Sequence, residues 1–461
     1  MRPSITGRAL LFGFIAFAGI GWMVAQGAEK PQDPRKNVND VTSPAYCGQC
    51  HKRIYREWSS SMMGRDLDNP VVYQFYTATN AHGKFDGLGF KGFMRMRGHP
   101  EENGDCADCH VPIQVIEAHE KGEGDVDLGA AMRLETRRDH GIACIFCHGV
   151  KDVHLKKGAD GRWNRRIFER VTLEKGVIHG PYPQAEDSPH DRFRVSKLYR
   201  SSEICGVCHL NQEKKVVSIS TYADWKELFD AGKTDKTCQD CHMPLIPGKA
   251  RAAEDAPLRE GLRHHVFIGA RDAEMRKKAL RLELKGYMKD GKLVVDTIVE
   301  NIGAAHTVPA SAPIRNVILK IDAVDENGKP LPWAGGKKGL LPPLAGMGNP
   351  KTGEKGPRDW AGLPGKMYAK VYRSAVVPKL GRPLVGVGGF AAEAEVFNTL
   401  LQYRKPDHAQ FTFHVPEGVK MVKVKARLVY RWAYKPLADR KGWNMPDLPM
   451  TEKEIRLNIG D

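Results

Sequence analysis

Residues 139–154, DHGIACIFCHGVKDVH, place Cys144 and Cys147 three positions apart, with His148 directly behind them and His154 six positions further on. The same Cys-x-x-Cys-His pattern occurs five times in the 461-residue chain and uses all ten cysteines. In chain order the first to fifth motifs are Cys47-Gly-Gln-Cys50-His51, Cys106-Ala-Asp-Cys109-His110, Cys144-Ile-Phe-Cys147-His148, Cys205-Gly-Val-Cys208-His209 and Cys238-Gln-Asp-Cys241-His242. A Cys-x-x-Cys pair alone also fits a zinc site or a redox dithiol, so the histidine behind every pair decides the chemistry.

The complete motif is typical of a covalently attached c-type haem. The two thiols form thioethers with the vinyl groups, and the histidine binds the iron as proximal ligand. We therefore expect five haems, held by all ten cysteines, with the five motif histidines as iron ligands. Because no cysteine is left for a disulfide, porphyrin burial and ligation are expected to hold this region together. Haem attachment of this kind takes place outside the cytoplasm.

The N-terminus agrees with export. Arg2 and Arg8 precede twenty residues without a charge, at residues 9–28. This pattern predicts a basic end in the cytoplasm and a periplasmic location for the rest of the chain. Two interpretations remain open: a signal peptide cleaved near residues 25–27, or an uncleaved helix that anchors the protein in the inner membrane. A linker is expected at residues 29–43.

Residues 44–270 are predicted to form a pentahaem cytochrome c domain, mainly helical and rich in loops. Too few residues separate His51 from His242 to build an ordinary side-chain core around each haem, so the porphyrins are expected to be the core. The chain without haem should then not fold. Residues 249–262 are interpreted as a linker, and residues 271–280 as a short connecting helix.

From residue 281 the apolar pattern changes to alternation, which is typical of strands. LRLELKGYMKDGKLVVDTIVEN predicts a hairpin with its turn at residues 289–292. Further strands are expected in NVILKIDAVDENGKPL, AKVYRSAVV, FTFHV and MVKVKARLVYRWAY. Residues 281–461 should therefore form an immunoglobulin-like antiparallel β-sandwich, which makes the whole chain an α+β multidomain protein. The Gly- and Pro-rich residues 333–365 are expected to leave the sheets as a long contact loop.

The formal net charge of +16 is unevenly placed. Residues 281–461 carry 29 Lys and Arg against 18 Asp and Glu, a surplus of 11. Five haems add about ten propionate charges to the earlier part, partly offset by ferric iron. The basic balance therefore does not indicate nucleic-acid binding. Simple solubility is one explanation, and docking on an anionic membrane surface or an acidic redox partner is the other.

Distal iron ligands must come from outside the motifs. His154 follows the third motif in a Gly-containing loop, and His190 and His265 lie inside the haem region, so all three are predicted ligands. Weaker candidates are His264, His179, His140, His119, His99 and His82. Met62 and Met63 are expected in the last turn of a helix that follows the first motif and ends at Gly64, with Ile54, Tyr55 and Trp58 on its haem-contacting face. Spacing does not assign any of these ligands to a particular iron.

Several segments resemble the multihaem cytochromes c related to the tetrahaem electron acceptor of hydroxylamine oxidoreductase. They are CGQCHKRIYREWSSSM from residue 47, GIACIFCHG with the histidine behind it, the run from SPH at 188 to TCQDCHMP at 237, HHVFIGA at 264 and NIGAAHTVP at 301. The resemblance implies distal roles for His154, His190 and His265. In relatives the helix after the first motif usually ends in a ligating histidine, and Met63 stands there in this chain. His306 matches an Asn-Gly-His-Pro loop of relatives, where it would either cap a haem or bond the domain junction.

Two functions of different class follow. The first is electron transfer: five closely spaced haems move single electrons between a membrane or periplasmic donor and another redox protein, and no catalytic residue is needed. The second is oxidation or reduction of a small nitrogen or sulfur compound at one open haem. Pentahaem nitrite reductases are similar in haem count but usually carry lysine in one motif, where this chain has histidine in all five. If Met63 binds iron, one haem should have a raised potential, because a thioether stabilises ferrous iron.

Overall fold

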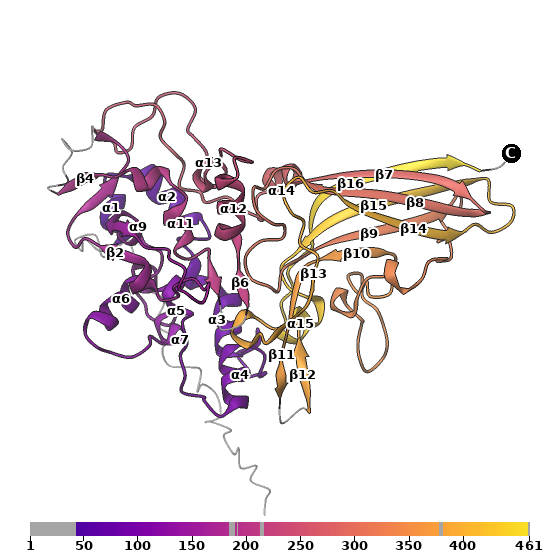
Figure 1. Ribbon diagram of the computed structural model, residues 1–461, viewed down its shortest axis with the longest axis horizontal. Coiled ribbons are helices and arrows are strands. Elements are labelled where there is room, and N and C mark those ends of the chain that lie inside the picture. The colour runs from indigo at the N-terminus through magenta and orange to yellow at the C-terminus, as the bar shows by residue number, and fades with distance from the viewer. Residues whose placement is uncertain (1–42, 184–189, 191, 213–215, 378–380, 460–461) are drawn as a thin grey trace, which may run out of the picture.

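The computed structural model describes residues 43–183, 190, 192–212, 216–377 and 381–459. The predicted leader or anchor and the linker at 29–43 therefore lie almost entirely outside the described residues. Within those residues, no helix has the length and apolar character needed to cross a bilayer. Figure 1 shows two halves side by side: short helices in residues 43–270, here the first half, and long strands in residues 271–459, the second half.

The first half consists of short helices joined by loops. They are α1 (Pro44–Gly48), α2 (Lys52–Ser60), α3 (Pro70–Thr77), α4 (Phe90–Arg97), α5 (Ala107–His110), α6 (Pro112–Glu120), α7 (Leu128–Ala131), α8 (Arg137–His140), α9 (Cys144–Gly149), α10 (Ile167–Arg170), α11 (Glu203–Gly206), α12 (Thr221–Asp230) and α13 (Cys238–His242). Three small two-stranded sheets, which the sequence did not predict, lie among them: β1 (Val150–Val153) with β2 (Val171–Leu173), β3 (Ile178–Gly180) with β4 (Phe193–Val195), and β5 (Asn211–Gln212) with β6 (Val217–Ile219).

Each of the five motifs lies on a helical turn, in or beside α1, α5, α9, α11 and α13. A helical turn brings positions i, i+3 and i+4 to one face. Both thiols and the histidine of a motif therefore point the same way. The backbone bonds from His51 N to Cys47 O (2.9 Å) and from His209 N to Cys205 O (3.0 Å) close such turns.

The first half also has a side-chain core, contrary to the expectation that porphyrins alone would form it. Its buried members come mainly from α3 to α7 and α9, namely Leu67, Tyr76, Phe90, Phe93, Met94, Ala107, Val111, Val115, Ile116, Leu128, Ala131, Met132, Phe146, Val150, Ile167, Val171 and Val207, with Ala391 from the second half. The apolar faces of these short helices pack on one another at one side of the motifs. The haem region is therefore only partly dependent on a cofactor for its packing.

The helix behind the first motif is shorter than predicted. α2 ends at Ser60, because the Ser61 hydroxyl donates to Trp58 O (2.7 Å) and accepts from Gly64 N (3.1 Å). Ser61 has an extended backbone, so the helix cannot continue through it. Met62 and Met63 consequently lie in the turn after the helix.

The second half begins with α14 (Ala273–Ala279), at the place of the expected connecting helix. The strands are β7 (Leu280–Lys289), β8 (Lys292–Asn301), β9 (Asn316–Asp325), β10 (Gly365–Tyr368), β11 (Lys370–Val377), β12 (Arg382–Val385), β13 (Ala394–Asn398), β14 (Asp407–His414), β15 (Met421–Arg431) and β16 (Leu448–Asn458), with helix α15 (Lys435–Lys441) before the last. The β7–β8 hairpin forms as predicted. Its turn residues Asp290 (φ 50°) and Gly291 (φ 70°) have the left-handed backbone that a tight hairpin turn requires.

Two antiparallel sheets share one apolar core in the second half. One has the order β14-β8-β7 and the other β10-β9-β15-β16. Alternate residues of these strands, such as Val295, Leu319, Phe411 and Val424, are almost completely buried in that core. An immunoglobulin-like strand layout stays a prediction. Residues 333–365 fold back on the sheets, where the Trp333 ring contacts Phe411 and Phe413.

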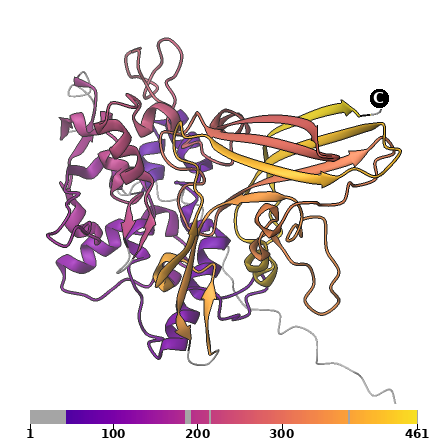
Figure 2. The same ribbon diagram turned by 45° about the vertical axis from the view of Figure 1, so that its right-hand side comes forward.

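A third sheet, β12-β11-β13, and helix α15 lie at the junction of the halves (Figures 1 and 2). The Lys441 ammonium has no solvent exposure and donates to Gln74 O (3.0 Å), Thr79 O (2.8 Å) and the Asp86 carboxylate (3.0 Å). Next to it, Trp443 Nε1 donates to the Gln74 side chain (2.6 Å). Buried polar contacts therefore fix the second half against the first.

Candidate haem cavity

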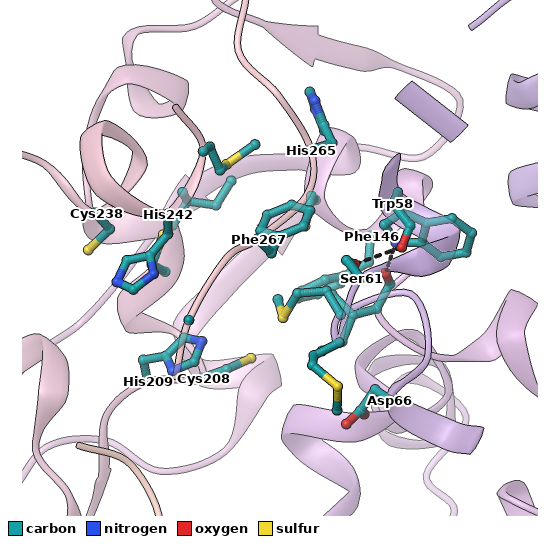
Figure 3. Close-up of a pocket in the computed structure, with 18 of the residues that line it drawn as sticks. Trp58, Ser61, Asp66, Phe146, Cys208, His209, Cys238, His242, His265 and Phe267 are labelled. Carbon is teal, nitrogen blue, oxygen red and sulfur yellow. Dashed lines mark hydrogen bonds between the residues drawn. The ribbon is translucent and has the colours of Figure 1, made fainter. Parts of the chain in front are cut away.

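One continuous cavity of about 3220 Å³ runs through the first half to the junction. Ordinary small-molecule pockets have roughly 300–1000 Å³. The cavity is lined by all ten cysteines and all five motif histidines. Figure 3 shows Cys208, His209, Cys238 and His242 around this space, with His265 and Phe267 entering from the loop after α13. The size and the lining together fit several large planar groups rather than a single ion.

Thiols of different motifs touch across the cavity. The Cys47 thiol neighbours that of Cys144, and the Cys109 thiol neighbours that of Cys208 and donates to the Cys208 carbonyl oxygen (3.8 Å). The Cys205 thiol likewise neighbours that of Cys238. These contacts join the first motif to the third, the second to the fourth, and the fourth to the fifth.

Four motif histidines are oriented through their Nδ1 atoms. In three of them Nδ1 donates to a backbone carbonyl oxygen: His51 to Ala252 (2.9 Å), His148 to His179 (2.8 Å) and His242 to Ile268 (2.6 Å). With Nδ1 engaged, Nε2 is the nitrogen left to bind a metal. Such outer hydrogen bonds fix the tautomer and the ring orientation of a ligand.

His110 differs, because its Nδ1 contacts the Asp66 carboxylate at 2.6 Å. Burial alone lowers the pKa of His110, but the Asp66 charge outweighs this effect and raises that pKa to about 9. A carboxylate partner makes an imidazole a more basic ligand than a carbonyl partner does. The histidine of the second motif should therefore be a more basic ligand than those of the other motifs.

Three motif histidines each face a second histidine ring. The ring centres are 5.9 Å apart for His51 and His190, 6.5 Å for His148 and His265, and 6.4 Å for His242 and His306, with interplanar angles of 7°, 24° and 14°. Two imidazoles on opposite sides of one metal have ring centres about 6.3 Å apart, given metal–nitrogen bonds of about 2.0 Å. The three pairs match this separation.

The protonation states of four histidines in the cavity also favour iron binding. Burial, with smaller contributions from neighbouring histidines, lowers the pKa of His209 and that of His265 to about 4. Burial likewise lowers the pKa of His148 and that of His306. These rings are therefore neutral at neutral pH, which is the form that binds iron.

The remaining predicted ligands have different placements. Met62 and Met63 both line the cavity. His154 does not line it, and its Nε2 is bonded to the Thr172 hydroxyl (2.9 Å). Within the described residues, no second histidine ring faces His110 or His209 at a comparable distance.

Most of the weaker histidine candidates have other partners. His264 contacts Glu57 (2.8 Å) and His179 contacts Glu174 (3.0 Å), while the His119 ring stacks on Phe168 at 3.7 Å. His82 and His99 are exposed at the surface. His140 and His179 line the cavity, and Nε2 of His140 contacts the Thr136 hydroxyl (3.1 Å).

Sequence reasoning missed the groups that orient the ligands. Asp66 was not singled out, and residues 249–262 are not a mere linker, since they supply the Ala252 carbonyl to His51. Within the described residues, no group of three or more His, Cys, Asp and Glu side chains is arranged to hold a bare metal ion. The zinc interpretation of the motifs therefore has no geometric support. The donor set fits haem attached at the thiols.

Comparison with known proteins supports this fold. No protein-family model matches the chain, and no curated protein matches it. Among solved structures, the chain is similar to a penta-haem cytochrome c552 from Thermochromatium tepidum, with a TM-score of 0.59 and 19% sequence identity over 89% of this chain and 97% of that one. At this identity the likeness shows the fold alone, and it extends over both halves of the chain.

Proposed function

We propose that this protein is a pentahaem c-type cytochrome that transfers single electrons between a membrane or periplasmic donor and another redox protein. The observation that carries the proposal is the set of three facing histidine pairs, at 5.9–6.5 Å, in one cavity lined by all ten motif cysteines. The fold of the penta-haem neighbour supports it. When bound, each haem supplies a one-electron couple.

The residues of this chain position and tune those couples. We assign His190 as the distal ligand opposite His51, His265 opposite His148, and His306 opposite His242. Met63 is proposed as the distal ligand of one of the two remaining irons, and His154 is left out because it lies off the cavity. His306 comes from the second half, so this half completes a site in the first.

The thiol contacts define a path for the electron. They link the first motif to the third and the fourth to the fifth, while the second branches from the fourth. The pKa of the Cys205 thiol is raised chiefly by its hydrogen bond with Cys238 and by burial, and in smaller part by Cys147, which therefore lies close to it. The third and fourth motifs are thus also neighbours. We infer one connected series of haems in the order first, third, fourth and fifth motif. The haem of the second motif branches from that of the fourth.

Location and partners complete the proposal. Covalent haem attachment supports a location outside the cytoplasm, with or without an N-terminal anchor. The basic second half would dock on an acidic redox partner or an anionic membrane surface, and such docking weakens as salt is added. The resemblance to the electron acceptor of hydroxylamine oxidoreductase favours a soluble redox protein as one partner.

The test begins with the mass of the mature protein, which should exceed that of the polypeptide by five haems. Electron paramagnetic resonance of the oxidised protein should then show mainly low-spin iron. His265→Ala should convert one low-spin centre to high spin. His264→Ala is the matched control, since its ring contacts Glu57 and does not line the cavity. Fewer covalent haems, bound zinc, or identical spectra for the two variants would contradict the proposal.

A second function, reduction or oxidation of a small nitrogen or sulfur compound at one haem, is favoured by His209. This ring lines the cavity, and among the described residues no second histidine faces it. If Met63 binds that iron or the His110 iron, Met63→Ala should abolish a near-infrared methionine-to-iron band that Met62→Ala retains. Carbon monoxide or cyanide binding to the unaltered protein would identify an open iron. Uniformly unreactive haems would exclude the catalytic alternative.

A further inference from the structure

Three cationic side chains converge on the cavity wall where the two halves meet. Arg65 follows α2 in the first half, Arg271 precedes α14, and Arg315 precedes β9. All three line the cavity, together with Tyr430 and Trp432 at the end of β15. The Arg271 and Arg315 guanidiniums lie 5.0 and 5.4 Å from the centre of the same Trp432 ring.

No carboxylate of the described residues neutralises these arginines. The acidic residues next to them in the chain are engaged elsewhere: Asp66 contacts His110 (2.6 Å), and Asp272 accepts from Met275 N (2.7 Å) at the start of α14. Burial lowers the pKa of Arg271, and Arg65 and Arg315 lower it further by repulsion. Like charges brought together without a counter-charge are destabilising. This part of the cavity wall therefore lacks a negative charge that would balance the three arginines.

A neutral donor points into the same place. The Tyr430 side chain is only 4% exposed, and its hydroxyl has no hydrogen-bond partner among the described residues. Burial raises the pKa of this hydroxyl, and the neighbouring Arg315 guanidinium lowers it in smaller part. A buried hydroxyl without a partner is rare in folded proteins, and it indicates a missing ligand or water. A hydroxyl donor beside two guanidiniums is the donor set that binds oxyanions and carboxylates.

We propose that Arg65, Arg271, Arg315 and Tyr430 form a binding site for an anionic oxygen group on the cavity wall where the two halves meet. Two sources have this chemistry: a haem propionate, or a small free oxyanion that enters the cavity. The propionate source rests on the proposed function, whereas the free-anion source does not require all five haems.

The test compares holoprotein carrying Arg271→Gln, Arg315→Gln or Tyr430→Phe with the unaltered holoprotein. Arg404→Gln is the control, because Arg404 also lies over a ring, Tyr403 at 5.3 Å, but does not line the cavity. Sulfate and nitrite are titrated by calorimetry, which detects binding with or without haem absorption. The haem potentials of the same samples are measured by spectroelectrochemistry, and their covalent haem by mass.

A free-anion site would give a saturable titration that weakens about tenfold or more in the three variants and not in Arg404→Gln. A propionate site would give no titration, but Arg271→Gln and Arg315→Gln would lower the potential of one haem, because a nearby cation disfavours ferric iron. The expected size is a tenfold change in the reduction equilibrium, about 59 mV for one electron. If the variants match Arg404→Gln in both measurements, the site does not exist. A missing haem mass would instead contradict the proposed function, and the titration would still decide the free-anion source.

Discussion

The two halves of this chain maintain their structures by different means. In the second half, strands of ten or eleven residues bury alternate side chains in one shared core. In the first half the longest helix has 10 residues, and helices shorter than about 12–15 residues are marginal alone. A large cavity occupies much of the space between them. The difference teaches that the second half is packed by a side-chain core alone, whereas the first half combines a side-chain core with a large cavity that is left to be filled.

The strongest way to break this comparison is to prevent haem attachment. With all ten cysteines replaced by alanine, we expect residues 43–270 to become susceptible to protease because the cavity lacks its filling. The second half should survive as a fragment that begins near α14. Limited proteolysis with mass spectrometry measures this directly. Equal protection of both halves would show that the side-chain core of the first half is sufficient.

A substitution at the junction of the two halves should have the next largest effect on stability. Lys441→Met removes a fully buried ammonium and leaves Asp86 without its counter-charge. Breaking a buried pair in this way costs about 3–5 kcal/mol. Denaturant unfolding should show this loss, and the two halves should then unfold separately. Adding Asp86→Asn should recover part of the stability; a double variant as unstable as the single one would mean that the ion pair is not the cause.

Within the second half, Leu319→Ala should lower the free energy of unfolding by about 2–5 kcal/mol, because Leu319 is completely buried in the shared core. The haem spectrum should not change. Leu258→Ala is the control, since Leu258 is 56% exposed. An altered haem spectrum in Leu319→Ala would mean that the second half also sets the geometry of the cavity.

The smallest expected effect concerns the difference between His110, which contacts a carboxylate, and the motif histidines that contact backbone carbonyls. Asp66→Asn weakens the carboxylate bond to His110 and should raise the potential of one haem by about 59 mV, a tenfold change for one electron. The other haems, oriented by backbone carbonyls, should keep their potentials. Asp68→Asn is the control, because Asp68 pairs with Arg137 and Arg138 instead. Spectroelectrochemical titration of both variants checks this prediction, and equal shifts would contradict it.

The sequence predicted what is encoded locally. The Cys-x-x-Cys-His spacing predicted attachment residues that all line one cavity, and the Asp290-Gly291 turn located the β7–β8 hairpin. It did not pair His265 with His148, because the residues between them form a path that spacing does not reveal. The carbonyl of Ala252 carries no sequence signal at all, since every residue has one. Asp66 reaches His110, and Tyr430 lies on the cavity wall with Arg271 and Arg315, only through tertiary packing.

The contacts between thiols of different motifs have a consequence for how the protein is made. Cys47 and Cys144, Cys109 and Cys208, and Cys205 and Cys238 are neighbours in the folded chain. In an oxidising environment, a polypeptide that collapsed early would cross-link these pairs into disulfides and lose its attachment points. If the chain is exported and carries haem as proposed, each porphyrin must therefore be bonded to its segment before the chain folds.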